Sequence, residues 1–147
     1  MVSGSALAIA EGMSDKIRSY RDLIAWQKAM DLVVLVYELT ENFPVREHFC
    51  LAREMRKSGI SIPSNISEGH SQRHGAYVRH LFVAVGSHSE LCTQSEIAFR
   101  LKYITGSKSD KLNGRLGEVG RLTQGLLNSQ LAMSPDSYDA DRFYPER

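Results

Sequence analysis

Apolar residues recur every three or four positions along four long stretches of this sequence, and no strand-like alternation competes with that pattern. The stretches cover about residues 22–42, 47–68, 76–105 and 107–131. Four amphipathic helices joined by short connections pack most simply with neighbouring helices antiparallel. The sequence therefore predicts an all-α fold, an antiparallel up-down-up-down four-helix bundle.

The first predicted helix begins at Asp22, a plausible N-cap, and Pro44 stops it after Asn42. Its expected apolar stripe consists of Leu23, Trp26, Met30, Val33, Val34 and Tyr37. The segment 32–37 is nevertheless apolar on every side, which suits a helix that is buried on two faces. Further apolar side chains off the main stripes are Leu35, Val78 and Phe82. This excess of apolar surface predicts homo-oligomerisation.

The second predicted helix starts near Glu47 and contains a proline, Pro63. Its buried face is expected to carry Leu51, Met55, Gly59, Ile62 and Ile66. A proline inside a helix removes one backbone donor and clashes with the carbonyl four residues back. Two outcomes follow: a kinked helix that continues to Glu68, or a break with a restart near Ser61 or Ser64. The unbroken apolar register through the proline favours the kink. We expect Ser64 and Asn65 to bond backbone groups that the kink frees, and residues 69–75 to form a loop.

The third and fourth predicted helices are joined at Gly106, a natural C-cap for the third. The third helix has the stripe Tyr77, Leu81, Ala84, Val85, Leu91, Cys92 and Ala98, and the fourth has Leu112, Leu116, Val119, Leu122 and Leu126. Residues 107–110 resemble a capping box. Three glycines inside the fourth helix, Gly114, Gly117 and Gly120, predict a close helix crossing on their side.

The two ends of the chain are expected to lie outside the bundle. Residues 1–19 are predicted to be a flexible extension, 20–131 the bundle and 132–147 a disordered acidic tail. Within this segment, residues 1–12 are interpreted as an upstream extension or a cloning remnant before Met13. The chain has no basic leader and no apolar run near the ~20 residues that span a bilayer. A cytoplasmic, non-membrane protein is therefore expected.

Catalytic and metal-binding signatures are scarce, so an enzyme is not expected and neither is a cofactor. His70 and His74 have the four-residue spacing of a metal-binding pair, with Glu68 as a third ligand, but the flanking glycines favour an exposed polar loop. His88 is expected to be a hydrogen-bonded core residue. The free cysteines Cys50 and Cys92 are interpreted as buried thiols.

Lysines and arginines number 18 against 17 acidic residues, a net charge of +1 that excludes binding of polyanions by overall charge alone. Only a localised basic patch could contact phosphates. Residues 69–89 contain no carboxylate, and residues 97–121 are rich in bases, so these two stretches are candidates to line one basic surface. The candidate nucleic-acid-binding residues are Arg53, Arg56, Lys57, Arg73, Arg79, Arg100, Lys102, Lys108 and Lys111.

Four segments resemble a known family: YRDLIAWQKA at 20–29, Phe43-Pro44, SIPSNISEG at 61–69 and GSHSE at 86–90. They resemble the four-helix bundle proteins encoded within insertions in large-subunit ribosomal RNA genes, the rRNA intervening-sequence proteins. The resemblance covers about residues 20–131 and implies an antiparallel bundle without catalytic residues. The positions it carries over look architectural: Pro63, Ser64, Asn65, Glu68, Gly69, Gly86, Ser87 and Glu90.

That family is similar in fold to the accessory variability proteins of diversity-generating retroelements, which are pentamers that bind a reverse transcriptase and nucleic acid. The resemblance thus implies a homo-oligomer, with a pentamer favoured, and RNA, an RNA/DNA hybrid or a reverse transcriptase as partner. We therefore expect a non-enzymatic accessory protein that binds structured RNA. The alternative is a protein-interaction scaffold with no role in binding nucleic acid.

Overall fold

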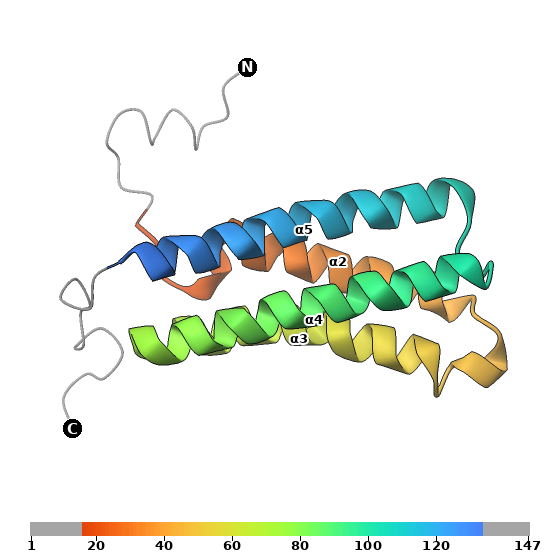
Figure 1. Ribbon diagram of the computed structural model, residues 1–147, viewed down its shortest axis with the longest axis horizontal. Helices are drawn as coiled ribbons and strands as arrows, with labels where there is room; N and C mark the ends of the chain where they lie inside the picture. The colour runs from red at the N-terminus through yellow and green to blue at the C-terminus, as the bar shows by residue number, and fades with distance from the viewer. Residues whose placement is uncertain (1–15, 134–147) are drawn as a thin grey trace, which may run out of the picture.

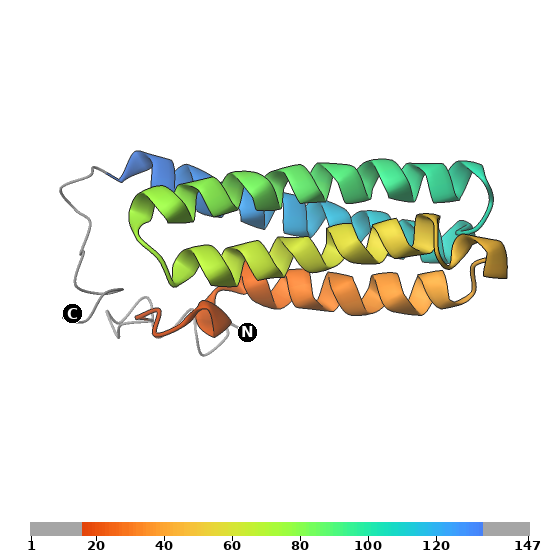
Figure 2. The ribbon, with the colours of Figure 1, turned by 90° about the horizontal axis from the view of Figure 1, so that it is seen from below.

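The computed structural model describes residues 16–133, and within them it contains helices and no strand. In chain order these are a short 3-10 turn η1 (Tyr20–Asp22), α2 (Ile24–Glu41), a second turn η2 (Val45–Glu47), α3 (Leu51–His70), α4 (His74–Arg100) and α5 (Gly106–Ala132). Each long helix runs antiparallel to the next, and α5 closes the bundle by packing beside α2 (Figures 1 and 2). The predicted four-helix bundle is therefore confirmed. Residues 1–15 and 134–147, expected as extension and tail, lie outside the described residues.

The core lies along the bundle axis and is built mainly from aliphatic side chains. Fully buried members include Leu32, Val36, Met55, Ile62, Ile66, Leu81, Leu91, Leu112, Val119 and Leu127. The members on α3 and α4 match the predicted faces. On α5, Leu112 and Val119 match, but Leu127 is buried where Leu126 was expected, and Leu122 and Leu126 are only partly buried. At the far end of α2, the Phe43 ring contacts Tyr103 at 5.3 Å between centroids and closes the core there.

The stripe predicted for the first helix is wrong. Its members Met30, Val34 and Tyr37 are 40%, 56% and 42% exposed, whereas Ala29, Leu32 and Val36 are fully buried. The alanine is small enough to let α2 approach its neighbours closely. Because 32–37 is apolar all round, periodicity alone could not select the inward face. Leu35, expected at the surface, is buried.

The first two helices also begin later than predicted. Asp22 does not cap α2; it closes a capping box on η1, where its carboxylate accepts from the Ser19 amide and the Ser19 hydroxyl accepts from the Arg21 amide. Glu47 belongs to η2, and α3 begins at Leu51. As predicted, α3 continues through Pro63 without a break.

The loop predicted at 69–75 is shorter in the structure, at 71–73, because α3 runs on to His70 and α4 starts at His74. Gly69 lies buried in the last turn of α3 against α4. A Cβ added there would meet the Cβ of His80 at 2.7 Å and the Tyr77 ring at 3.0 Å. The glycine therefore permits a close helix crossing, whereas the sequence suggested a loop boundary.

Gly106 is not the C-cap of α4. The helix ends at Arg100, and the following turn places Lys102 in the left-handed region at φ 64°. The amides of Tyr103 and Lys102 donate to the carbonyls of Ala98 and Phe99, the two bonds of a Schellman motif. Gly106 opens α5 at φ 58°, and the N-cap Thr105 makes no side-chain cap, so the capping box predicted at 107–110 is absent.

The glycines of α5 only partly confirm a close crossing. A Cβ on Gly120 would lie 2.5 Å from the His88 ring of α4, but one on Gly114 would meet open space. At Gly117, the nearest atom is an Arg121 nitrogen of the same helix.

Candidate nucleic-acid interface

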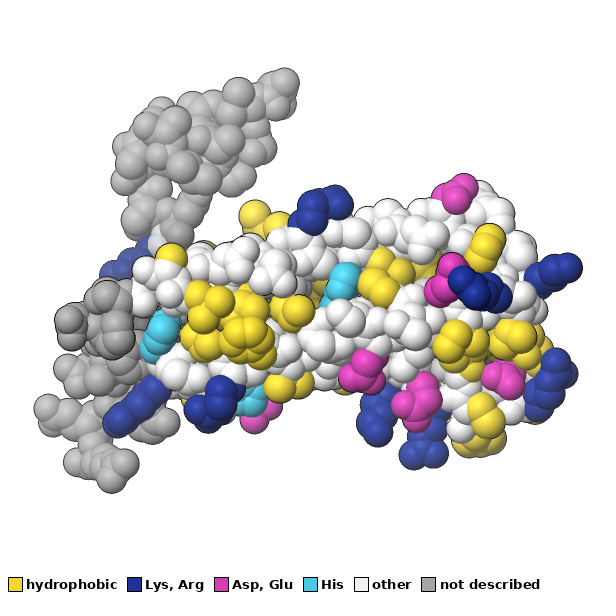
Figure 3. Space-filling model, viewed as in Figure 1, with side chains coloured by type: hydrophobic (Ala, Val, Ile, Leu, Met, Phe, Trp, Pro, Cys, Tyr) yellow, Lys and Arg dark blue, Asp and Glu magenta, His cyan; other side chains and the backbone are white. Residues whose placement is uncertain are grey.

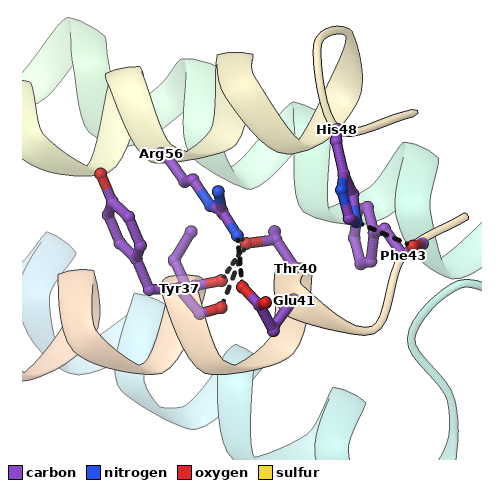
Figure 4. A network of polar contacts seen from close by, with 7 residues as sticks. Tyr37, Thr40, Glu41, Phe43, His48 and Arg56 are labelled. Atoms are coloured by element: carbon purple, nitrogen blue, oxygen red, sulfur yellow. Dashed lines mark hydrogen bonds and ion pairs between the residues drawn. The ribbon is translucent and has the colours of Figure 1, made fainter. Parts of the chain in front are cut away.

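Arg56, the central residue of the predicted basic cluster on α3, makes its contacts with α2 inside the bundle. Its Nε donates to Thr40 Oγ1 at 2.9 Å and its Nη2 lies 3.3 Å from Glu41 Oε2, while its guanidinium sits 4.6 Å from the centre of the Tyr37 ring (Figure 4). Only 23% of the Arg56 side chain is exposed. The contacts join α3 to α2, so we assign Arg56 a structural role.

The other predicted cations do not form one surface. Arg53, Lys57, Arg100, Lys102, Lys108 and Lys111 are exposed around the end where α4 leads into α5, whereas Arg73 and Arg79 lie at the opposite end. Along α4, Arg79 lies 21 residues, or about 32 Å, from Arg100. The cations at 100–111 therefore lie apart from those of 69–89. Arg121, the last residue of the stretch 97–121, is the exception, because the bonds His88–Leu116 and His74–Gln130 place it beside the first half of α4.

The charges divide unevenly along the bundle axis. We define the basic half as residues 16–27, 62–87 and 119–133, and the neutral half as 29–61 and 88–117. The basic half holds six Lys and Arg against two acids, whereas the neutral half holds nine against eight. The pair Lys28 and Glu118, 3.9 Å apart, marks the boundary. In Figure 3, Asp and Glu side chains accordingly gather toward the α4–α5 turn.

Three cations of the basic half were missed at the sequence level: Lys16, Arg18 and Arg21, all exposed. A fourth, the exposed Arg121, ends the base-rich stretch 97–121 but was not among the named candidates. The Arg21 guanidinium sits 5.5 Å from the ring centres of both Tyr20 and Trp26. Such stacking holds a guanidinium in a defined position. Arg79 forms no ion pair with any described residue.

Asp22 is one of the two acids of the basic half, and its carboxylate accepts hydrogen bonds from nearby backbone amides. Backbone amides of Arg18 and Ser19 donate to its carboxylate at 2.9 and 3.3 Å and lower its pKa, with help from the charges of Arg18 and His70. The charge of His70 contributes because the turn η1 packs beside α3. The segment 18–22 thus belongs to the same end of the bundle as Arg73.

The family-like motif residues meet at the seam between α3 and α4, the closest helix pair. Asn65 Nδ2 donates to the Ser61 carbonyl at 2.8 Å, and its Oδ1 accepts from His80 Nδ1 at 2.9 Å. The Ser61 and Ser87 hydroxyls are 2.6 Å apart. Asn65 and Ser87 are therefore architectural, as expected. The carbonyl that Pro63 leaves free is that of Gly59, so the expectation that Asn65 bonds it is wrong.

Other motif positions make no such contact. Ser64, Glu68, Gly86 and Glu90 are exposed, and a Cβ on Gly86 would meet nothing within 4 Å. Packing within one chain therefore does not explain why these residue types occur at these four positions.

The histidines act mainly as tethers between helices. His74 Nε2 donates to the Gln130 carbonyl at 2.8 Å and His88 Nε2 to the Leu116 carbonyl at 2.6 Å, so α4 is tied to α5 twice. His70 is buried and lies edge-on to Tyr77, which overturns the expected exposed loop. Across residues 16–133, no group of three His, Cys, Asp or Glu side chains is arranged to hold a metal.

The two cysteines differ from expectation in burial. Cys50 is exposed, while Cys92 is half-buried with its Sγ 3.6 Å from His88 Nε2. Burial raises the pKa of the Cys92 thiol, which keeps it protonated and unreactive near neutral pH.

An apolar groove of about 310 Å³ runs between α2 and α3 near η1. Its lining consists of Tyr20, Trp26, Met30, Val33, Ile60, Pro63, Ser64 and Ser67. Three of the residues in the wrongly predicted α2 stripe, Trp26, Met30 and Val33, thus form a second, outer apolar face.

Comparison with known proteins agrees with this architecture. The sequence model of the 23S rRNA-intervening sequence protein family matches residues 21–125. A solved structure of similar fold is a protein of unknown function from the S23 ribosomal protein family of Bacteroides thetaiotaomicron. It is 21% identical, has a TM-score of 0.65, and the match covers 71% of this chain and 96% of that one. No curated protein shows significant similarity to the chain. No helix among the described residues is long and apolar enough to cross a membrane.

Proposed function

Because the chain belongs to the 23S rRNA-intervening sequence protein family, we propose that it binds RNA, and that the basic half contacts the phosphate backbone. The observation that carries this proposal is the charge asymmetry: six cations against two acids in one half and near balance in the other. Phosphate contacts need clustered Lys and Arg but no base-reading groups. The proposed contact residues are Lys16, Arg18, Arg21, Arg73, Arg79 and Arg121.

The test compares two charge-matched triple variants in a salt series, using an RNA hairpin and a single strand of equal length as probes. The first variant, Arg18→Gln/Arg21→Gln/Arg79→Gln, removes three charges from the basic half. The second, Arg53→Gln/Lys57→Gln/Lys108→Gln, removes three charges of the sequence-predicted set from the neutral half. Each lost phosphate contact should reduce the slope of log K against log salt by about 0.7–0.9.

We expect the first variant to lose about two units of slope and the second to change little. Equal losses in both variants would show that the basic half has no special role. Circular dichroism of each variant checks that the bundle is intact. If the wild-type chain binds neither probe at low salt, the proposal fails.

The second candidate function, an interaction scaffold without RNA binding, is favoured by the apolar groove between α2 and α3. Its walls include Met30 and Ile60, 40% and 42% exposed, which is typical of a surface that meets another protein. A chain that binds no RNA but retains a specific protein partner would support this candidate.

We also propose that the functional unit is a homo-oligomer. Large apolar side chains are exposed on α2 (Ile24, Val34) and on α4 (Phe82, Val83), and Figure 3 shows an apolar patch over α4 and α5. Self-association would cover these faces and repeat the basic half around a symmetry axis. A pentamer that serves a reverse transcriptase is the most specific form of this proposal, and co-purification of the chain with such an enzyme tests it.

A further inference from the structure

The apolar groove between α2 and α3 ends at a cluster of two aromatic rings and one cation. The rings of Tyr20 and Trp26, which line the groove, meet edge to face at 5.2 Å between centroids. The Arg21 guanidinium sits 5.5 Å from the centre of each ring. Figure 2 shows η1, which carries Tyr20 and Arg21, where α2 begins and α3 ends. The groove thus combines apolar walls with a positive charge at one end.

Hydrogen bonds hold this end of the groove in place. Gln27 Nε2 donates to the Arg21 carbonyl at 2.8 Å, and the capping box of Ser19 and Asp22 fixes the turn η1. The Arg21 guanidinium forms no ion pair with any residue in 16–133. Its charge is therefore available to a ligand in a site that is largely formed beforehand, which lowers the entropic cost of binding.

The α3 wall of the groove adds polar groups to the apolar surface. Ser67 Oγ donates to the Ser64 carbonyl at 3.0 Å, whereas the Ser64 hydroxyl is exposed and bonds no described residue. A hydroxyl can both donate and accept a hydrogen bond. The groove itself has no charged lining residue, so a ligand inside it has to be neutral, with apolar faces and a polar edge.

We propose that the groove receives one unpaired base of the bound RNA. The inference rests on the proposed function, because it names the form of RNA that the basic half takes. A base has apolar faces for the walls and a hydrogen-bonding edge for the Ser64 hydroxyl. Since one sugar separates a base from its phosphate, a base beside Trp26 brings a negative charge to Arg21. The groove volume of about 310 Å³ lies at the lower end of the range for small-molecule sites.

The same contacts favour a base over a helix of another protein. An aliphatic helix face would suit the apolar walls, but it would give neither Arg21 nor the Ser64 hydroxyl a partner. Bases inside a duplex are paired and stacked, so only a single strand, a loop or a bulge can place one in the groove. We therefore expect the chain to prefer single-stranded RNA to a fully paired duplex.

The test compares two double variants that keep the charge of the chain. Met30→Ser/Ile60→Ser removes apolar side chains that are 40% and 42% exposed in the groove. Val45→Ser/Ile97→Ser removes exposed apolar side chains at the opposite end of the bundle. The probes are a short single-stranded RNA and inorganic polyphosphate of similar charge, which has no bases. Circular dichroism checks that both variants retain the bundle.

We expect the groove variant to bind the RNA about threefold to tenfold more weakly than the control variant. The slope of log K against log salt should be the same in both, because neither loses a phosphate contact. Both variants should bind polyphosphate equally. An equal loss of affinity for polyphosphate in the groove variant would contradict a contact with the base.

Trp26 gives a second readout, since it is the only tryptophan of the chain. Its fluorescence in the wild-type chain should change when single-stranded RNA is added and much less when duplex RNA is added. Equal RNA affinities of the two variants, together with unchanged Trp26 fluorescence, would overturn the inference and leave the proposed function standing. A wild-type chain that binds neither single-stranded nor duplex RNA would refute the proposed function and the inference with it.

Discussion

Within residues 16–133, Lys102 is the one residue other than glycine that has a positive φ. Side chains other than glycine are disfavoured at its φ of 64° because Cβ crowds the following carbonyl. The Schellman bonds to Ala98 and Phe99 hold the turn in this conformation. The side chain itself is exposed and forms no ion pair with described residues, so it offers no contact that offsets the strain.

Lys102→Gly should therefore raise the free energy of unfolding by about 0.5–1 kcal/mol, measured by urea denaturation. Lys111→Gly, an exposed position inside α5, should lower the free energy of unfolding by up to about 1 kcal/mol. A loss of stability in the Lys102 variant would show that its side chain makes a contact that the turn needs.

Residue roles were the part that the sequence predicted least well. Angles around a helix correctly place Arg56 away from the Met55 face, but they cannot show that α2 presents Thr40, Glu41 and Tyr37 to it. The same applies to His70: the flanking glycines suggest a loop, while the partner that buries it, Tyr77, comes from the next helix.

At the scale of elements, the seam between α3 and α4 depends on small side chains and one polar network. Gly69 lets the last turn of α3 approach His80, and Asn65 bonds the same histidine one turn earlier. The atom nearest a new Cβ at Gly69 is the His80 Cβ, which is attached directly to the backbone. A side chain at position 69 therefore fits only if the backbones of α3 and α4 move apart.

Gly69→Ala should lower the free energy of unfolding by about 1–3 kcal/mol. Gly114→Ala on α5 faces open space and should instead raise it by up to about 1 kcal/mol. Thermal and urea unfolding of both variants gives the comparison. Equal stabilisation by the two alanines would mean that α3 and α4 do not approach as closely as described.

Helix number, order and antiparallel packing were predictable because they follow from period and connection length. The inward face of α2 was not, since a helix apolar all round has no unique inward direction. The starts of the first two helices also differ from the predicted ones. Asp22 and Glu47 lie in 3-10 turns, and the local sequence does not distinguish such a turn from the first turn of an α-helix.

At the scale of the whole molecule, a count of charged residues along the sequence does not reveal the charge asymmetry. Residues 97–121 have six bases to two acids, but α2 brings Asp31 and Glu38 beside Lys111 and Arg115, all four lining one groove. The basic half emerges only when segments from four helices are placed side by side. Two of its cations, Lys16 and Arg18, come from residues that the sequence assigned to an extension.

Self-association is the remaining property of the whole molecule that can be tested directly. Val34 is 56% exposed and Phe82 55% exposed, on α2 and α4 respectively. If copies bury these faces, the urea midpoint of the wild-type chain should rise with protein concentration, since association stabilises only the folded state. Light scattering should give a mass that is a multiple of 16.5 kDa.

Val34→Glu and Phe82→Glu each place a charge where a copy would pack, and burying an unpaired carboxylate is costly. At least one of them should reduce the mass toward the monomer and remove the concentration dependence of the midpoint. Asn113→Glu adds the same charge at an exposed polar position of α5 and should change neither property. A wild-type chain that is monomeric at every concentration would refute the oligomer, and the basic half would then have to bind RNA as a single copy.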